Sequence, residues 1–226
     1  GLLKIRIKTW DNKTDYYLDF KSGFDFENET YSASIGSNPD FNTDLLRYSF
    51  TSLTTPYSVI DHNIKSQKEE IKKQQEILGG EFDSNNYTSE RLFATAHDGK
   101  KIPISIVRHV DTELSPETPI LQYAYGSYGS TVDPSFSSVR LSLLDRGFAF
   151  AIAHIRGGQY LGRPWYEDGR MLSKKNTFKD FVSCSKYLID NNLTSKNHLY
   201  AEGGSAGGLL MGAIMNMAPE LYNGVI

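Results

Sequence analysis

The stretch Leu199-Tyr200-Ala201-Glu202-Gly203-Gly204-Ser205-Ala206-Gly207-Gly208 decides the fold class of this chain. A short apolar run of strand character, residues 199–201, leads into the pentapeptide 203–207, and a run of helical character, residues 209–217, follows. A G-x-S-x-G sequence between a strand and a helix is typical of the nucleophile elbow, a sharp turn that holds a serine in a strained conformation. Glycines two positions before and after the serine leave room for the turn. The stretch therefore predicts an α/β fold with Ser205 as a candidate nucleophile.

A serine nucleophile of this kind requires a base, because a hydroxyl reacts poorly at neutral pH. In this fold the acidic residue and the histidine of the triad follow the serine in sequence. All five histidines of the chain precede Ser205, and no histidine or aspartate follows it: His62, His97, His109, His154 and His198. His154 ends an apolar strand, but its place before the serine argues against a role as the base. We therefore expect residues 1–226 to carry the nucleophile without its base.

Stabilisation of the oxyanion needs two hydrogen-bond donors near the serine. The backbone N–H of Ala206, directly after the nucleophile, is the first candidate. The second must come from a loop after another strand, where the sequence reads Tyr123-Ala124-Tyr125-Gly126-Ser127-Tyr128-Gly129. The hydroxyl of Tyr125 can donate to an oxyanion, or its ring can simply be packed, and the residues alone leave both open. Arg156 in Ile155-Arg156-Gly157-Gly158 likewise has two open interpretations. It can place a cation near the site, or it can stabilise a turn as part of a buried ion pair.

The composition limits the other classes of function. The chain is 39% hydrophobic and 23% charged, as in globular proteins, and its net charge of −3 is too small to indicate a nucleic-acid partner. We find no signal-peptide pattern and no apolar run long enough for a membrane span, so a cytoplasmic location is expected. No zinc-ligand spacing, P-loop or dinucleotide fingerprint is present, which predicts no metal and no cofactor. The single cysteine, Cys184, excludes an internal disulfide and is expected to be buried.

The first part of the chain is predicted to be β structure. Short strands alternate with Gly, Asn, Asp, Ser and Pro clusters, as in a sandwich, barrel or propeller; they are residues 3–8, 16–20, 31–35, 45–50 and 57–60. The charged stretch Lys65–Gln75 is either a solvated helix or an edge strand. Gly79-Gly80 then marks a break.

From residue 81 the pattern alternates between strands and helices. Asp98-Gly99 between two apolar runs predicts a hairpin. Further along, the expected strands are residues 119–125, 147–153 and 199–201, and the expected helices are residues 137–144, 177–191 and 209–217. Such alternation predicts a largely parallel sheet with the active site at the carboxyl ends of its strands.

The run from Tyr123 to Ile226 resembles the prolyl oligopeptidase family (S9) of serine peptidases, and within it the oligopeptidase B branch. The resemblance rests on Tyr125-Gly126-Ser127-Tyr128-Gly129, residues 140–147, Ile155-Arg156-Gly157-Gly158, Trp165-Tyr166-Glu167-Asp168-Gly169, Lys175-Asn176-Thr177-Phe178 and Gly203-Gly204-Ser205-Ala206-Gly207-Gly208. Gly-Ser-Ala-Gly-Gly and Tyr-Gly-Ser-Tyr favour this branch over the prolyl-specific one.

The resemblance implies a fold and an activity. Residues 1–70 would be the last part of a β-propeller with its hinge, and residues 71–226 the first part of an α/β-hydrolase catalytic domain. Ser205 would be the nucleophile, and Tyr125 would complete the oxyanion hole with the Ala206 N–H. The substrates would be short peptides cleaved after Arg or Lys. A prolyl-specific peptidase, an esterase of the same fold and a non-catalytic module are the alternatives.

The resemblance also places the catalytic Asp and His, and the acidic residues that select Arg or Lys, after Ile226. We therefore expect the chain to be a fragment that is inactive alone. A sheet interrupted in this way leaves an open edge, so we also expect it to associate with itself or with the missing part.

Overall fold

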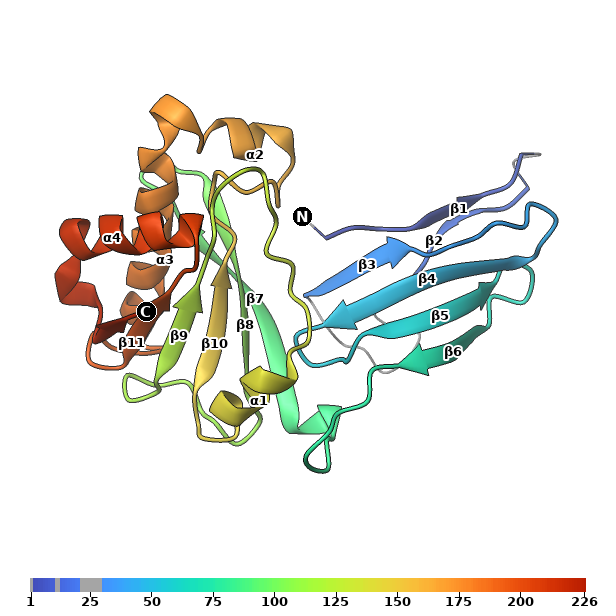
Figure 1. Ribbon diagram of the computed structural model, residues 1–226, viewed down its shortest axis with the longest axis horizontal. Helices are drawn as coiled ribbons and strands as arrows, with labels where there is room; N and C mark the ends of the chain where they lie inside the picture. The colour runs from blue at the N-terminus through green and yellow to red at the C-terminus, as the bar shows by residue number, and fades with distance from the viewer. Residues whose placement is uncertain (1, 11–12, 21–29) are drawn as a thin grey trace. The chain divides into compact units, whose positions relative to one another are not determined.

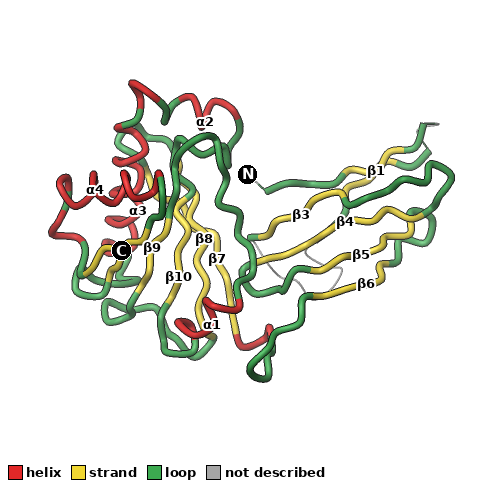
Figure 2. Tube along the Cα trace, in the orientation of Figure 1, coloured by secondary structure: helices red, strands yellow, loops and turns green. Residues whose placement is uncertain are grey.

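The computed structural model describes residues 2–10, 13–20 and 30–226, which form two compact units (Figures 1 and 2). The β unit comprises residues 2–84 and the short segment 134–138, and the α/β unit comprises residues 85–133 and 139–226. The units divide at Ser84 and Asn85. The boundary predicted between residues 70 and 71 concerns the propeller and hydrolase domains of the family, and it stays a prediction.

The β unit is built from antiparallel strands. They are β1 (Arg6–Lys8), β2 (Asp15–Tyr17), β3 (Tyr31–Ile35), β4 (Leu45–Ser52), β5 (Ser58–Asn63) and β6 (Glu69–Gln74). β1 pairs with β2, while β3 to β6 form a four-stranded sheet in chain order. Alternate side chains of these strands turn inward, because successive residues of a strand point to opposite faces. Together with residues just outside β1 and β2, they form one apolar core, which contains Ile5, Ile7, Leu18, Phe20, Tyr31, Ala33, Tyr48, Phe50 and Ile60.

Two expectations for the β unit need correction. Residues 69–74 form the strand β6 at one edge of the sheet, so the solvated-helix alternative for Lys65–Gln75 is wrong. Its charged and mostly exposed side chains suit an edge strand, because charge discourages pairing with another chain. β1 and β2 are shorter than the strands predicted at 3–8 and 16–20, since the two strands pair over only three positions. The other three strands lie where the alternation predicts them.

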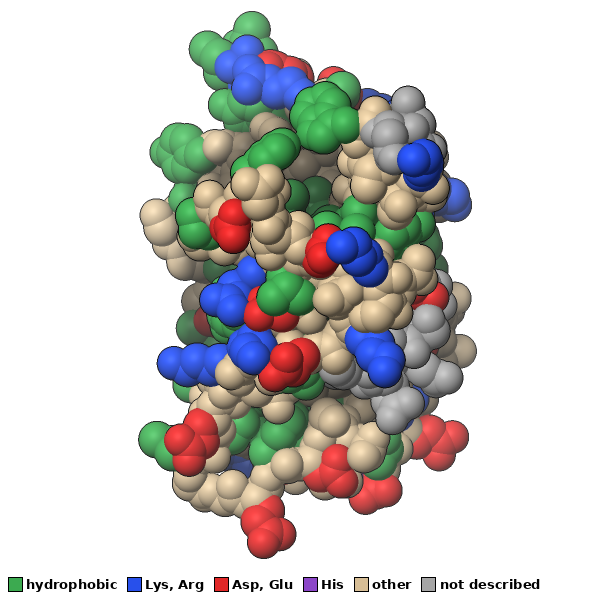
Figure 3. All heavy atoms as spheres, turned by 90° about the vertical axis from the view of Figure 1, so that its right-hand side faces the viewer, with side chains coloured by type: hydrophobic (Ala, Val, Ile, Leu, Met, Phe, Trp, Pro, Cys, Tyr) green, Lys and Arg blue, Asp and Glu red, His purple; other side chains and the backbone are tan. Residues whose placement is uncertain are grey.

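The surface of the β unit carries charges of both signs. Figure 3 shows Lys and Arg side chains interspersed with Asp and Glu. Several form exposed ion pairs, such as Arg6 with Asp15 at 2.6 Å and Lys65 with Asp44 at 2.7 Å. Exposed pairs of this kind contribute only about 0–1 kcal/mol each to stability. They affect solubility more than the fold.

The α/β unit contains a six-stranded sheet in the order β12-β11-β9-β10-β8-β7. Its strands are β7 (Tyr87–Thr95), β8 (Lys101–His109), β9 (Ile120–Tyr123), β10 (Ala149–Ala153), β11 (Leu199–Glu202) and β12 (Gly224–Val225). β7 and β8 form the hairpin predicted around Asp98-Gly99, and β8 runs antiparallel to β10. The pairs among β9, β10, β11 and β12 are parallel. The largely parallel sheet and its hairpin are therefore confirmed.

The helices are α1 (Ser138–Leu144), α2 (Arg163–Glu167), α3 (Lys175–Asp190) and α4 (Ala206–Met217), with short 3₁₀ turns at 171–173 and 219–221 and a third at the unit boundary, 84–86. α1 and α3 cover opposite faces of the sheet, as neighbouring residues of β9 show. Gln122 donates to the carbonyl of Phe181 in α3 at 3.1 Å. The next residue, Tyr123, points to the opposite face, where its ring stacks with that of Phe150. The guanidinium of Arg140 in α1 lies over the Phe150 ring. Within the described residues, no helix is both long and apolar enough to cross a bilayer.

A buried ion-pair cluster ties three parts of the α/β unit together. Arg156, at 0% exposure, donates to both carboxylate oxygens of Asp180 in α3, at 2.8 and 2.5 Å. It also donates to Asp98 in the β7–β8 turn at 2.6 Å. Burial disfavours the charge on Arg156, but hydrogen bonds to the two carboxylates outweigh this and raise its pKa. The structural alternative for Arg156 is therefore confirmed. Cys184, also in α3, is buried as predicted, and burial raises the pKa of its thiol.

Candidate active site

Ser205 lies on the sharp turn between β11 and α4, in the conformation that the motif predicts. Its φ of 54° and ψ of −117° fall in a region that non-glycine residues rarely adopt. Such a backbone costs of the order of 1–3 kcal/mol and persists only where the surroundings enforce it. The side chain is exposed at the surface of the unit. The turn therefore exposes Ser205 to solvent at the cost of local strain.

Two glycines make this turn sterically possible. A Cβ at Gly203 would lie 2.6 Å from the carbonyl oxygen of Gly207 and 3.1 Å from Met211. A Cβ at Gly207 would lie 3.0 Å from the carbonyl oxygen of Ala124. The requirement for glycine two positions before and after the serine is thus confirmed, and each position has an identified neighbour.

The elbow lies at a topological switch point of the parallel sheet. β11 and β9 are neighbours, with Glu202 opposite Tyr123. The chain leaves β9 through α1 toward β10, and leaves β11 through α4 toward β12, on the other side. Loops that depart in opposite directions from adjacent parallel strands leave a crevice at their carboxyl ends, where α/β proteins bind ligands. Ser205 follows one of these two strands and Tyr125 follows the other.

The structure brings Tyr125 beside the elbow. A Cβ on Gly207 would lie 3.8 Å from the Cα of Tyr125 and 3.9 Å from its ring. The Tyr125 side chain is half-buried, and its ring lies 6.4 Å from that of the exposed Tyr128. The adjacency of the two predicted site residues is therefore established, while the donation from the Tyr125 hydroxyl stays a prediction.

Ala206 is the first residue of α4, so its backbone N–H is among the helix amides that have no acceptor within the helix. The positive end of the helix dipole is located there and favours a developing negative charge. The next two amides already have acceptors. The Gly207 N–H donates to the carbonyl of Gly204 and the Gly208 N–H to the carbonyl of Ser205, both at 2.8 Å. This arrangement suits Ala206 to the predicted role of oxyanion donor.

His154, the alternative base, is a buried structural residue. Its Nε2 lies 2.7 Å from the Ser105 hydroxyl, and its ring stacks on Tyr160 at 3.7 Å with an interplanar angle of 9°. Burial, assisted by the charge of Arg91, lowers the pKa of His154 to about 3. A base with that pKa is nearly useless at neutral pH. The sequence argument against His154 thus agrees with its surroundings.

Burial of neutral His154 predicts acid sensitivity. The unfolded state takes up a proton near pH 6.5 and the folded state only near pH 3, so this contribution to stability is present above pH 6.5 and is lost as the pH falls. The loss amounts to at most about 1.4 kcal/mol per pH unit. We expect the melting temperature of the full-length gene product to fall from pH 7 to pH 5 more steeply than that of His154→Gln. Parallel pH profiles for the two proteins would contradict the assignment.

The sequence analysis missed Lys174, whose ammonium group contacts the Tyr125 loop. Its Nζ donates to the carbonyl of Gly126 and to the Ser127 hydroxyl, both at 2.6 Å. Lys174 is the N-cap of α3. A cation at a helix N-terminus is disfavoured by the helix dipole, but the sequence carries no signal of this mismatch, because its pattern predicts a helix only from residue 177.

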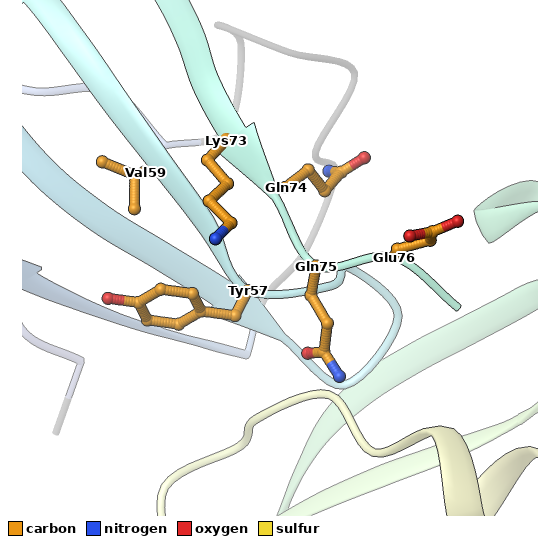
Figure 4. A pocket seen from close by; sticks show the side chains of 6 residues that line it. All are labelled: Tyr57, Val59, Lys73, Gln74, Gln75 and Glu76. Atoms are coloured by element: carbon orange, nitrogen blue, oxygen red, sulfur yellow. The ribbon is translucent and has the colours of Figure 1, made fainter. Parts of the chain in front are cut away.

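The β unit has a separate hollow, of about 670 Å³, beside the edge strand β6 (Figure 4). Side chains from β5, β6 and the residues next to them line it: Tyr57, Val59, Lys73, Gln74, Gln75 and Glu76. None of these is a serine, cysteine or histidine, so the lining holds no candidate nucleophile with a neighbouring base. The lining of this hollow therefore offers no alternative to Ser205 as a candidate nucleophile.

Comparison with known proteins agrees with the geometry. Residues 134–226 match the model of the prolyl oligopeptidase family. The whole chain is 45% identical to a dipeptidyl aminopeptidase BI of Pseudoxanthomonas mexicana, of which it covers 30%. It is 40% identical over 87% of its length to protease 2 of Moraxella lacunata, covering 28% of that protein. Oligopeptidase B from Leishmania major superimposes with a TM-score of 0.84 at 38% identity, over 98% of this chain and 31% of that structure. The chain thus spans about 30% of these relatives.

Proposed function

Because this chain belongs to the prolyl oligopeptidase family, we propose that it supplies the nucleophile and oxyanion hole of a serine peptidase that hydrolyses short peptides. Its fold combines part of an α/β-hydrolase domain with part of a β-propeller. The observation that carries the proposal is Ser205 on a strained turn at the switch point of a parallel sheet, with Tyr125 beside it.

In the proposed reaction, Ser205 Oγ attacks the carbonyl carbon of the scissile peptide bond while a histidine takes the hydroxyl proton. The negative charge that develops on the carbonyl oxygen is stabilised by the Ala206 N–H and the Tyr125 hydroxyl. Collapse of the tetrahedral species expels the amine, which receives the proton, and leaves an acyl-enzyme on Ser205. Water then attacks this ester by the same steps. In this fold, the histidine and its acidic partner follow the nucleophile in sequence, so we assign both to the part of the protein after Ile226.

For the substrate we propose peptides cleaved after Arg or Lys. The similarity to protease 2 and to oligopeptidase B supports this choice. Removal of N-terminal dipeptides is the second candidate, because the relative that matches the whole chain at 45% identity is named a dipeptidyl aminopeptidase. Prolyl specificity is a third, since a prolyl endopeptidase of Elizabethkingia meningoseptica is 36% identical over 78% of the chain. The cytoplasmic location and the association of residues 1–226 with the remainder of the protein also stay proposals.

Three fluorogenic amides distinguish these candidates in the full-length gene product. We expect turnover of an amino-blocked diarginyl amide and little turnover of an amino-blocked glycyl-prolyl amide. A glycyl-arginyl amide with a free amino group tests dipeptide release, since blocking its amine abolishes cleavage only in a dipeptidyl peptidase. Cleavage of the prolyl amide alone would overturn the basic specificity. Failure to cleave any amide, together with hydrolysis of nitrophenyl butyrate, would favour an esterase.

A further inference from the structure

The loop that carries Tyr125 is attached to α3 through one ammonium group. Lys174 Nζ bonds the carbonyl of Gly126 and the hydroxyl of Ser127, each at 2.6 Å. These atoms belong to the two residues that directly follow Tyr125. Hydrogen bonds from a charged donor are shorter and about twice as strong as neutral ones. The loop therefore has a strong attachment next to the candidate oxyanion donor.

The Lys174 ammonium is held by the Tyr125 loop rather than by a carboxylate of the described residues. Among the described residues, no carboxylate lies within 4.0 Å of its Nζ, although the chain has many ion pairs elsewhere. The side chain is half-buried, and desolvation lowers its pKa. A partly buried cation at the N-terminus of a helix is costly unless its N–H groups are satisfied. Here the Tyr125 loop accepts two of its hydrogen bonds.

Steric contacts from α3 and from the turn after β10 also confine this loop. Gly126 has a φ of +66°, and a Cβ there would lie 2.5 Å from Thr177 and 2.8 Å from Ile155. The N–H of Gly129 donates to the carbonyl of Gly157 at 3.0 Å. The loop is thus enclosed by the first turn of α3 and the turn after β10. Lys174 supplies the polar part of this enclosure.

We propose that Lys174 is a positioning residue for the reaction, which holds the Gly126–Ser127 turn so that Tyr125 stays aligned with Ser205. This inference rests on the proposed function, in which Tyr125 donates to the oxyanion. A donor that is displaced by even about 1 Å loses much of its effect on the transition state. Because the oxyanion forms only after substrate has bound, loss of alignment lowers kcat and leaves KM nearly unchanged.

The test compares Lys174→Met, Tyr125→Phe and the double variant in the full-length gene product. Methionine keeps an apolar stem of similar length but removes the donors. We expect Lys174→Met to lower kcat by about 10–100-fold, less than the 10²–10³-fold expected for loss of a whole oxyanion donor, with KM changed less than about twofold. The double variant should be no slower than Tyr125→Phe alone, because Lys174 acts through Tyr125. Lys175→Met, an exposed neighbour on α3, is the matched control and should match the wild type.

Each outcome supports or overturns the inference. An unchanged kcat for Lys174→Met, a change in KM alone, or losses that multiply in the double variant would overturn the positioning role while the peptidase assignment stands. If the wild-type protein cleaves the amide and Tyr125→Phe cleaves it equally fast, Tyr125 does not belong to the oxyanion hole. The positioning role of Lys174 would then be wrong as well. Should Lys174→Met fail to fold, Lys174→Gln retains a donor without the charge, and we expect an intermediate kcat with the same KM.

Discussion

Replacement of Ser205 by alanine is expected to lower kcat of the full-length gene product by about a million-fold, the size seen when the nucleophile of a serine peptidase is removed. The alanine variant keeps the turn but lacks the oxygen that forms the acyl-enzyme. Slow residual turnover remains, since the Ala206 N–H and the rest of the site still stabilise the transition state. The measurement is cleavage of the amino-blocked diarginyl amide, together with labelling by a fluorophosphonate probe.

The matched control is Ser66→Ala, because Ser66 is an exposed serine of the β unit. It should retain wild-type turnover and labelling. Thermal unfolding of the Ser205 variant should match that of the wild type closely, which separates lost chemistry from lost structure. If Ser205→Ala kept more than about one per cent of the activity, the nucleophile would have to be another residue, and the assignment of the elbow would be wrong.

Removal of the Arg156 guanidinium is expected to have the largest effect on stability. Asp180 is 0% exposed, and in Arg156→Met its carboxylate would remain buried without a counter-charge. Breaking one side of a buried ion pair typically costs about 3–5 kcal/mol. We expect a loss of this size in the free energy of unfolding, measured by denaturant titration of the α/β unit within the full-length protein. Asp98 adds to the effect, since Arg156 is its partner as well.

A double variant separates the ion pair from simple packing. Arg156→Met with Asp180→Leu leaves no unpaired charge at this position in α3, so it should be more stable than Arg156→Met alone by at least about 1 kcal/mol. Equal stability of the two variants would mean that the cost comes from lost packing around the Arg156 stem. Arg156→Lys is not expected to rescue stability, because an ammonium group cannot reproduce the forked contacts to two carboxylates.

Local patterns predicted the features of the fold that depend on neighbouring residues. The hairpin at Asp98-Gly99, the buried strand β10 and the helix α3 lie close to their predicted positions, since turn residues and apolar periodicity define them. The ends of β1 and β2 and the nature of residues 69–74 depended on strand pairing. Where a strand stops pairing, and whether a charged stretch joins a sheet at all, depends on its partner strand, and neither stretch carries a turn signal as clear as Asp98-Gly99.

In the candidate site, too, some features follow from neighbouring residues and others depend on the three-dimensional fold. The turn at Ser205 follows from its own pentapeptide, because the glycines and the serine all belong to one segment. The family resemblance implied that Tyr125 lies near the elbow, and the structure shows the reason, which is that β9 and β11 are neighbours in the sheet. The contact of Lys174 with the Tyr125 loop joins residues almost fifty positions apart. It could be found only once the three-dimensional arrangement was known.

The crowding around Gly203 and Gly207 affects how tolerance to substitution should be interpreted at this site. A side chain at Gly203 would clash with the backbone at 2.6 Å, and one at Gly207 would be crowded by the Ala124 carbonyl at 3.0 Å, whereas Gly204 has no atom within 4 Å of where a side chain would start. A survey of all single substitutions would therefore find Gly203 about as intolerant as Ser205, Gly207 less tolerant than an open position, and Gly204 permissive. Intolerance in this pentapeptide reports available space as well as chemistry, and only a reaction-based assay can tell the two apart.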